Sequence, residues 1–359
     1  MTAAGTTGAR GAERARGRAT TSAGPAGRVV TLTANPSLDR TLDLPAALTE
    51  GGIVRLTGSS TEPGGKGVNV ARAIAAAGSD VVSVLPAAAS DPIVTALLAL
   101  GLELATVPVQ TPVRTNYTLV DPAGTTTKLN EPGAALSEAT RAALSDLLHG
   151  HATAAQWTVL SGSLPPSTPV DWYADLVRSL RDTGSRIAVD TSEAPLLALV
   201  SAGPDAAPDL LKPNAEELAQ LAGLSEDEVL RNPAAMVAAV RSLHDRGVGE
   251  VLVTLGAEGA VLSTTDGGLW SATPPPITVR STVGAGDCSL AGYLLASLAG
   301  APPAERLRTA VAYGAASASL PGSAVPTPAQ VDGLAVRVTA GHPGGESSVP
   351  VAAAGRDVP

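Results

Sequence analysis

Apolar and polar positions alternate along the chain with the periods of strands and helices. Residues 28–33 (RVVTLT) form a short apolar run that predicts a buried strand, and residues 68–78 (VNVARAIAAAG) have the period of a helix that ends at Gly78. The alternation continues, with strands expected at 80–86, 157–162, 186–192, 209–214 and 250–256 and helices at 91–101, 169–184, 194–203, 215–223 and 233–247. Such alternation predicts βαβ units, and therefore an α/β fold with a largely parallel sheet.

Two segments interrupt this order. Residues 40–62 and 105–130 lack the helical period and alternate polar with apolar positions, which predicts exposed strands. They form either a small second sheet over a cleft or an ordinary extended segment on the surface, and the pattern favours neither. The chain becomes helical again over 305–320 and 328–338.

The composition adds that the chain can build one large globular unit. It has 359 residues, of which 44% are hydrophobic, and a mean hydropathy of +0.20. Residues 1–27 are rich in arginine and have no apolar block, so we interpret them as a disordered leader and not as a secretory signal. We expect one folded domain over 28–338 and a loose tail over 339–359.

Charge and aromatic content argue against nucleic-acid binding. The formal net charge is −9, or about −13 without the first 28 residues, and aromatic residues make up 2% of the chain. No apolar run is long enough to span a membrane. The lone Cys288 is typical of a reducing cytoplasm, and the histidine spacing predicts no structural zinc.

Residues 281–294 (STVGAGDCSLAGYL) place a lone acid at the start of an apolar run. Asp287 is either a helix cap or a catalytic base. In the second reading, the backbone N–H groups of Gly284, Ala285 and Gly286 would hold an anion beside it. The local pattern by itself favours the cap.

Residues 62–74 (EPGGKGVNVARAI) surround a lysine with glycines directly before a helix. Gly64, Gly65 and Lys66 are either a structural turn or a phosphate site, although the Walker pattern is absent. We favour anion binding, because Lys66 is one of only three lysines among 24 basic residues.

Further polar residues lie beside the expected strands. Asp39 either accepts hydrogen bonds from sugar hydroxyls or merely ends a strand. Arg114 is either a bidentate phosphate clamp or a solvated charge on an exposed strand. Asn214 and Glu217 form either a capping box or water-mediated contacts to a phosphate-bound Mg²⁺. Residues 253–262 predict a hairpin whose glycine turn either approaches a nucleotide or only reverses the chain.

The order of these motifs is typical of one enzyme family. Residues 63–78 and 281–287 resemble the two signatures of the ribokinase-like carbohydrate kinases, the PfkB family, and the resemblance covers 28–338. Within the family the motifs NPSLD, GGKG, SGSLP and STVGAGD are most similar to the 1-phosphofructokinase branch, with tagatose-6-phosphate kinase and the minor 6-phosphofructokinase as close relatives. The resemblance implies a ribokinase-like three-layer sandwich with a small β-sheet lid within 40–62 and 105–130.

The resemblance also implies an activity. It indicates an ATP-dependent kinase, with Mg²⁺, that converts fructose 1-phosphate to fructose 1,6-bisphosphate. The alternatives are tagatose-6-phosphate kinase, 6-phosphofructokinase, or a sugar-phosphate sensor without turnover. A cytoplasmic homodimer that pairs through the lid is expected, with no nucleic-acid or membrane partner.

Finally, the resemblance assigns roles to individual residues. Asp287 would be the base, and the N–H groups of 284–286 would hold the transferred phosphoryl group. The residues implied for the sugar phosphate are Asp39 and Asn69 on its hydroxyls, Lys66 and Arg114 on its phosphate, and Gly64 and Gly65. The residues implied for the nucleotide are Lys212, Asn214, Thr254, Gly256, Glu258 and Gly259, with adenine near 310–319. Mg²⁺ would be reached through water by Glu217 and Asn214.

Overall fold

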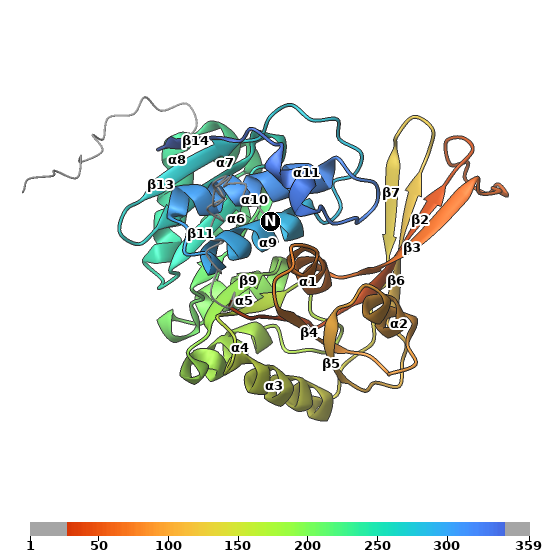
Figure 1. The fold of residues 1–359 in the computed structure, drawn as a ribbon, viewed down its shortest axis with the longest axis horizontal. Helices are drawn as coiled ribbons and strands as arrows, with labels where there is room; N and C mark the ends of the chain where they lie inside the picture. Colours follow the sequence, from red (N-terminus) through yellow and green to blue (C-terminus); the bar gives the residue numbers. More distant parts are fainter. Residues whose placement is uncertain (1–26, 342–359) are drawn as a thin grey trace, which may run out of the picture.

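The computed structural model describes residues 27–341; the expected leader before residue 27 and the expected tail after residue 341 lie outside the described residues. Figure 1 shows a main body and a small sheet that projects from it. The main sheet has the strand order β14 (Arg337–Ala340), β13 (Leu269–Thr273), β12 (Ala260–Thr264), β11 (Glu250–Thr254), β10 (Leu210–Leu211), β9 (Arg186–Asp190), β8 (Trp157–Ser161), β1 (Val29–Thr33), β4 (Val81–Pro86) and β5 (Glu103–Val107).

The main sheet is parallel from β5 to β11, and β12, β13 and β14 extend it in antiparallel register. Strand β14 runs to Ala340, so the sheet continues two residues past the expected domain end at 338. All five residues of β1 are buried, because helices cover both faces of this strand. Val29 and Val30 point to opposite faces and belong to two separate apolar clusters.

Helices form the two outer layers. The cluster around Val29 includes side chains of α1 (Lys66–Ala76), α2 (Pro92–Ala99), α9 (Ala285–Leu298), α10 (Pro303–Ala318) and α11 (Pro328–Asp332). The cluster around Val30 includes side chains of α3 (Glu138–Ala152), α4 (Trp172–Leu180), α5 (Glu193–Ser201), α6 (Ala215–Ala222), α7 (Glu226–Arg231) and α8 (Pro233–His244). The predicted three-layer α/β fold is therefore confirmed. Helices α3 and α7 were not predicted from the sequence.

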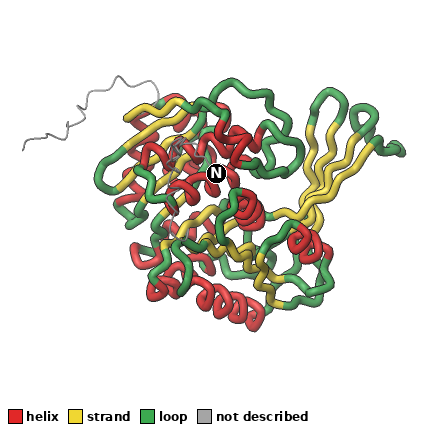
Figure 2. Tube along the Cα trace, viewed as in Figure 1, coloured by secondary structure: helices red, strands yellow, loops and turns green. Residues whose placement is uncertain are grey.

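The small sheet has the order β3 (Gly58–Gly64), β2 (Ser37–Asp43), β6 (Arg114–Val120) and β7 (Thr126–Asn130). Its strands stand apart from the helices in Figure 2, where they are yellow. Strands β2 and β6 pair in parallel, and the other two pairs are antiparallel. Residues 44–57 contain no strand, and residues 105–107 belong to β5 of the main sheet, so the strands fill only part of the two expected segments.

Close packing brings helix α1 to the carboxyl end of β1. A Cβ atom on Gly67 would lie 2.5 Å from Oγ1 of Thr33 and 2.8 Å from the carbonyl oxygen of Leu32. Only a residue without a side chain allows this approach. The carboxyl ends of β1, β9, β10 and β11 meet at the same edge of the sheet, which is where open α/β sheets bind ligands. Within residues 27–341, no helix is long and apolar enough to cross a membrane.

Candidate active site

Asp287 lies in the first turn of α9, which begins over this edge. The helix is preceded by Gly284, whose φ of +77° is the left-handed conformation that glycine adopts freely. The Asp287 side chain is buried, and its Oδ2 accepts a 2.9 Å hydrogen bond from Nδ2 of Asn69 on α1. Burial and the charge of Asp190 raise the pKa of Asp287 to about 6. An acid with this pKa is deprotonated at neutral pH and suited to accept a proton.

Two lysines converge on one buried carboxylate beside Asp287. Asp190, at the end of β9, is fully buried and lies 2.8 Å from Nζ of Lys66 and 3.0 Å from Nζ of Lys212. Burial alone would raise the pKa of Asp190, but the two lysine charges outweigh it and lower the pKa. Burial would likewise lower the pKa of Lys66, yet Asp190 and Asp287 raise it. The Lys66 ammonium therefore stays charged at neutral pH.

Asn214 and Glu217 form the capping box that the sequence offered as one alternative. The Asn214 N–H donates to Oε2 of Glu217 at 2.8 Å, and the Glu217 N–H donates to Oδ1 of Asn214 at 2.7 Å. The other carboxylate oxygen of Glu217, Oε1, lies 4.0 Å from Nζ of Lys66, and Glu217 lines a cavity. Burial raises the pKa of Glu217. A carboxylate oxygen at a phosphate site fits a hydrated Mg²⁺, whereas Oδ1 of Asn214 already serves the helix start.

The largest group of predicted residues lines one cavity of about 750 Å³. Its polar wall holds the two lysines, Asp287 and the start of α9. The predicted nucleotide residues that line it are Lys212, Asn214, Thr254, Gly256 and Gly259; Glu258 is exposed and does not. Small residues of α10 form another wall, namely Val311, Gly314, Ala315 and Ala318, within the segment predicted for adenine. A cavity lined by both charged and apolar residues suits a nucleotide.

A second cavity of about 640 Å³ lies between the small sheet and the loop before α9. Asp39 lines it, and its Oδ1 accepts hydrogen bonds from Ser37 at 2.8 Å and Asn116 at 3.0 Å. These contacts orient a carboxylate that can accept bonds from a hydroxylated ligand. Thr282 lines both cavities, so the two ligand spaces meet at the loop that leads to Asp287. This arrangement can support group transfer between two bound molecules.

The structure does not bring Lys66 and Arg114 together. Lys66 lines the larger cavity, whereas Arg114 lines a narrow recess of about 20 Å³ and donates from Nη1 to the carbonyl oxygen of Glu131 at 3.0 Å. Burial lowers the pKa of Arg114. Two cations that the sequence analysis did not select, Lys128 and Arg280, line the second cavity instead. Their spacing along the chain gave no signal, because the cavity is assembled from distant segments.

Asp190 is the main functional residue that the sequence analysis left without a role. Its segment, residues 186–192, was predicted only as a strand. The available signal was its place at the end of a predicted buried strand, where an unpaired acid costs free energy and calls for a cationic partner. The identity of those partners, Lys66 and Lys212, depends on the tertiary fold.

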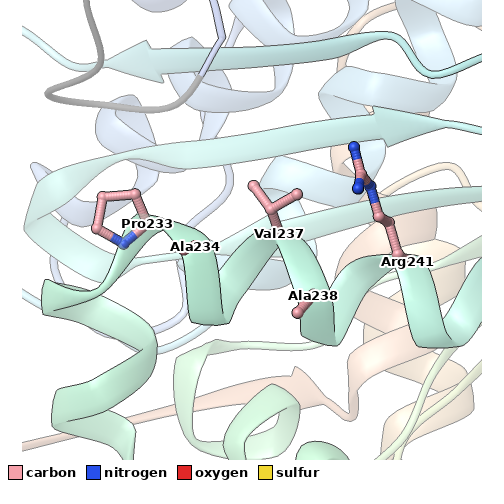
Figure 3. Close-up of a pocket in the computed structure, with 5 residues that line it drawn as sticks. All are labelled: Pro233, Ala234, Val237, Ala238 and Arg241. Carbon is pink, nitrogen blue, oxygen red and sulfur yellow. The ribbon is translucent and has the colours of Figure 1, made fainter.

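Another hollow, of about 580 Å³, follows the outer face of α8 (Figure 3). It is lined by Pro233, Ala234, Val237, Ala238 and Arg241. Arg241 is its only charged lining residue, and none of the predicted site residues contributes to it. The chemistry therefore concentrates at the two cavities that meet beside Asp287.

Comparison with known proteins agrees with this geometry. Residues 33–330 match the pfkB family carbohydrate kinases. The chain is 36% identical to the 1-phosphofructokinase of Rhodobacter capsulatus, over 87% of this chain and 97% of that one. It is 33% identical to the ATP-dependent 6-phosphofructokinase isozyme 2 of Escherichia coli, over 81% and 92% of the two chains.

Solved structures show the same fold. Phosphofructokinase-2 from Escherichia coli, crystallised in complex with substrates and products, superposes with a TM-score of 0.76 at 30% identity, over 85% of this chain and 97% of that one. The ribokinase of Arabidopsis thaliana, at 21% identity, has a TM-score of 0.67 over 85% and 97%. The resemblance inferred from the sequence motifs is thereby confirmed. The chain belongs to the pfkB family of carbohydrate kinases and is a sugar-phosphate kinase, a phosphotransferase with an alcohol group as acceptor and ATP as phosphate donor.

Proposed function

We propose that this kinase transfers the γ-phosphoryl group of ATP to the 6-hydroxyl of fructose 1-phosphate, forming fructose 1,6-bisphosphate and ADP. The observation that carries the proposal is the buried carboxylate of Asp287, which lines the larger cavity close to the point where both cavities share Thr282. The choice of substrate is supported by the 1-phosphofructokinase relatives from Rhodobacter capsulatus and Xanthomonas campestris, each 36% identical.

Asp287 is the proposed base. Its carboxylate accepts the proton of the 6-hydroxyl while the hydroxyl oxygen bonds to the γ-phosphorus, and the bond from that phosphorus to the leaving ADP oxygen breaks. The backbone N–H groups at Gly284, Ala285 and Gly286, at the start of α9, hold the charged phosphoryl oxygens. Lys66 and Lys212 line the same cavity and add positive charge.

Mg²⁺ is proposed as the companion of ATP, where it would neutralise phosphate charge. Glu217 fits the role of a residue that reaches the hydrated ion, because it lines the larger cavity and its Oε1, unlike Oε2, does not serve the capping box. Asn214 fits less well as a direct partner, since its Oδ1 is bonded to the Glu217 N–H.

The sugar would occupy the second cavity. Asp39 and Asn69 are proposed to hold its hydroxyls, and the Asn69 amide also donates to Asp287. Because Lys66 is paired with Asp190, we assign the phosphate already on the sugar to Arg114, which lines a separate recess but whose charge interacts with Asp39 of the second cavity. Lys128 and Arg280, which line the second cavity itself, are further candidates. Replacing Arg114 with Met should raise the KM for the sugar phosphate and leave the KM for ATP unchanged; an unchanged sugar KM would exclude Arg114.

A substrate panel tests the proposal. ADP release should be measured with fructose 1-phosphate, fructose 6-phosphate and tagatose 6-phosphate, with unphosphorylated fructose as the control. We expect the highest kcat/KM for fructose 1-phosphate. A clear preference for fructose 6-phosphate would favour the second candidate, a 6-phosphofructokinase, which the Escherichia coli relative supports. A preference for tagatose 6-phosphate would overturn both.

A sensor without turnover is the rival from another class. Asp287→Asn should keep ATP binding and lower kcat by about 10²–10⁴-fold, the usual contribution of a general base. If the unaltered protein binds ATP and the sugar phosphates yet releases no ADP, the sensor reading is correct. Retained turnover in Asp287→Asn would instead remove Asp287 from its proposed role.

We also propose a cytoplasmic homodimer that forms through the small sheet. Strand β7 is exposed along its length, and β3 is exposed over most of its outer part. Large apolar side chains are exposed on or near this sheet, namely Leu48, Ile53, Leu56 and Leu129. Sedimentation equilibrium should give twice the chain mass, and Ile53→Asp combined with Leu129→Asp should give the single-chain mass. A monomeric unaltered protein would contradict the proposal.

A further inference from the structure

A buried arginine lies behind Asn69 on helix α1. Arg72 is 7% exposed, and its Nη1 lies 3.0 Å from the carbonyl oxygen of Pro63, 3.2 Å from that of Ser323 and 3.3 Å from Oδ1 of Asn69. The Ser323 segment is held in turn by Glu62, whose Oε2 accepts from the Ser323 N–H at 2.9 Å and from its hydroxyl at 2.6 Å. The guanidinium therefore rests on two backbone carbonyls that do not depend on Asn69.

The position of Arg72 decides which way the Asn69 amide faces. A guanidinium has only donors, so the atom of Asn69 that meets it must be the carbonyl oxygen Oδ1. The amide nitrogen Nδ2 then points to the other side, where it donates to Oδ2 of Asp287 at 2.9 Å. A rotated amide would face the carboxylate with its oxygen, an acceptor, and the guanidinium with its NH2 group, a donor, so neither contact would be a hydrogen bond.

We propose that Arg72 is a positioning residue, which fixes the amide of Asn69 so that Asp287 is held as a carboxylate ready to accept a proton. The inference rests on the proposed role of Asp287 as the base. A donor facing the charged form of an acid favours that form, and an acceptor facing it favours the protonated form. Arg72 thus acts on the base through Asn69; it lines neither ligand cavity itself, although its partner Ser323 lines the second one.

Three charged groups besides Arg72 face Asp287, and Arg72 itself also interacts with the neighbouring Cys288 thiol. Lys66 faces Asp287 from α1, Asp190 from the end of β9 and Lys212 from the segment after β10, and burial together with Asp190 gives Asp287 a pKa of about 6. Cys288, next in the chain, is a buried thiol. Because all these groups remain in place when Arg72 is replaced, a shift in the titration of Asp287 reports the loss of the oriented amide.

The test compares Arg72→Met and Arg72→Lys with the unaltered enzyme. In Arg72→Met, we expect the acidic limb of the kcat/KM profile against pH to move up by about one unit, so that activity falls more at pH 6 than at pH 8. Arg72→Lys keeps the charge but has a single donor nitrogen. The acidic limb of its profile should therefore lie between those of Arg72→Met and the unaltered enzyme. The profile is the informative readout, because a general loss of stability would not move it.

Arg306→Met is the matched control. Arg306 on α10 is also buried and ion-paired, with Nη1 2.8 Å and 2.7 Å from the two carboxylate oxygens of Glu250, but it belongs to another network. Its replacement should lower the melting temperature and leave the acidic limb in place.

Each outcome separates this inference from the proposed function. An unshifted limb in both folded Arg72 variants, or in Arg72→Lys when only that one folds, overturns the positioning role. An equal shift in Arg306→Met overturns it as well. If Asp287→Asn loses turnover, the proposed function remains supported even when the Arg72 test fails. If Asp287→Asn retains turnover, Asp287 is not the base, and both the proposed function and the positioning role are contradicted.

Discussion

Asn69 and Asp287 are 218 positions apart in the sequence, yet Nδ2 of Asn69 lies 2.9 Å from Oδ2 of Asp287. The contact joins the starts of two helices, α1 and α9, which pack against each other over the carboxyl end of the main sheet. It supplies the buried Asp287 with a hydrogen-bond donor that favours its charged form. Both sequence motifs of the family therefore act as one site.

The first prediction concerns pH. Because burial and Asp190 raise the pKa of Asp287 to about 6, the active carboxylate is lost as the pH falls through this value. We expect kcat/KM to be level at neutral pH and to decrease about tenfold per pH unit well below 6. Steady-state rates between pH 5 and 9 would measure this limb.

Ionisation of the ligand phosphates also occurs near pH 6. The residual activity of Asp287→Asn separates the two effects, since a limb caused by the ligands persists in that variant and a limb caused by Asp287 disappears. If Asp287→Asn keeps the full acidic limb, the assignment of this limb to Asp287 is wrong.

Asp190→Asn should affect both stability and titration. It leaves Lys66 and Lys212 without the carboxylate that they share, and removing one partner of a buried ion pair costs about 3–5 kcal/mol. The loss of its negative charge should also move the acidic limb downward, because Asp190 helps to raise the pKa of Asp287. Denaturant unfolding and the pH profile measure the two effects.

Asp205→Asn is the control for this prediction. Asp205 pairs with Arg178 at 2.6 Å, but the Asp205 side chain is 66% exposed and that of Arg178 36% exposed, so a smaller change in the unfolding midpoint is expected. An equally small effect of Asp190→Asn would show that the lysines do not need their shared carboxylate.

Gly64→Ala should impair sugar binding. The added Cβ would lie 2.2 Å from Oδ2 and 2.4 Å from Cγ of Asp39, so this carboxylate has to leave its contacts with Ser37 and Asn116. We expect a higher KM for the sugar phosphate with the KM for ATP unchanged. The control is Gly150→Ala on α3, where an added Cβ meets nothing within 4 Å. Equal KM values for both variants would show that Asp39 is not used.

Cys288 should be inert toward thiol reagents in the native protein. Its side chain is 1% exposed, and burial raises its pKa to about 12, so the thiolate is scarce at neutral pH. Labelling followed by mass spectrometry should be slow in buffer and complete in denaturant. Rapid labelling of the native protein with loss of activity would place the thiol at an open site instead.

The sequence by itself determined the α/β class and the family, and it selected many of the residues that line the larger cavity. Strand and helix periods are local properties, and β1 could be recognised because all of its residues are buried. Motifs such as GGKG and GAGD were also informative because they are local: each places its characteristic residues within a few consecutive positions. Helix α3 was missed because only three of its residues, Leu144, Leu148 and Ala152, are buried, which leaves a weak apolar stripe.

Only the tertiary structure decided how charges are paired. It placed Lys66 on Asp190 and away from Arg114, brought Lys128 and Arg280 to the second cavity, and set Arg72 behind Asn69. These relationships join strands and helices that are distant in the sequence, and hydrogen bonds and ion pairs depend on distances of a few ångströms. Local patterns select the residue types, but the packing of helices on the sheet selects their partners.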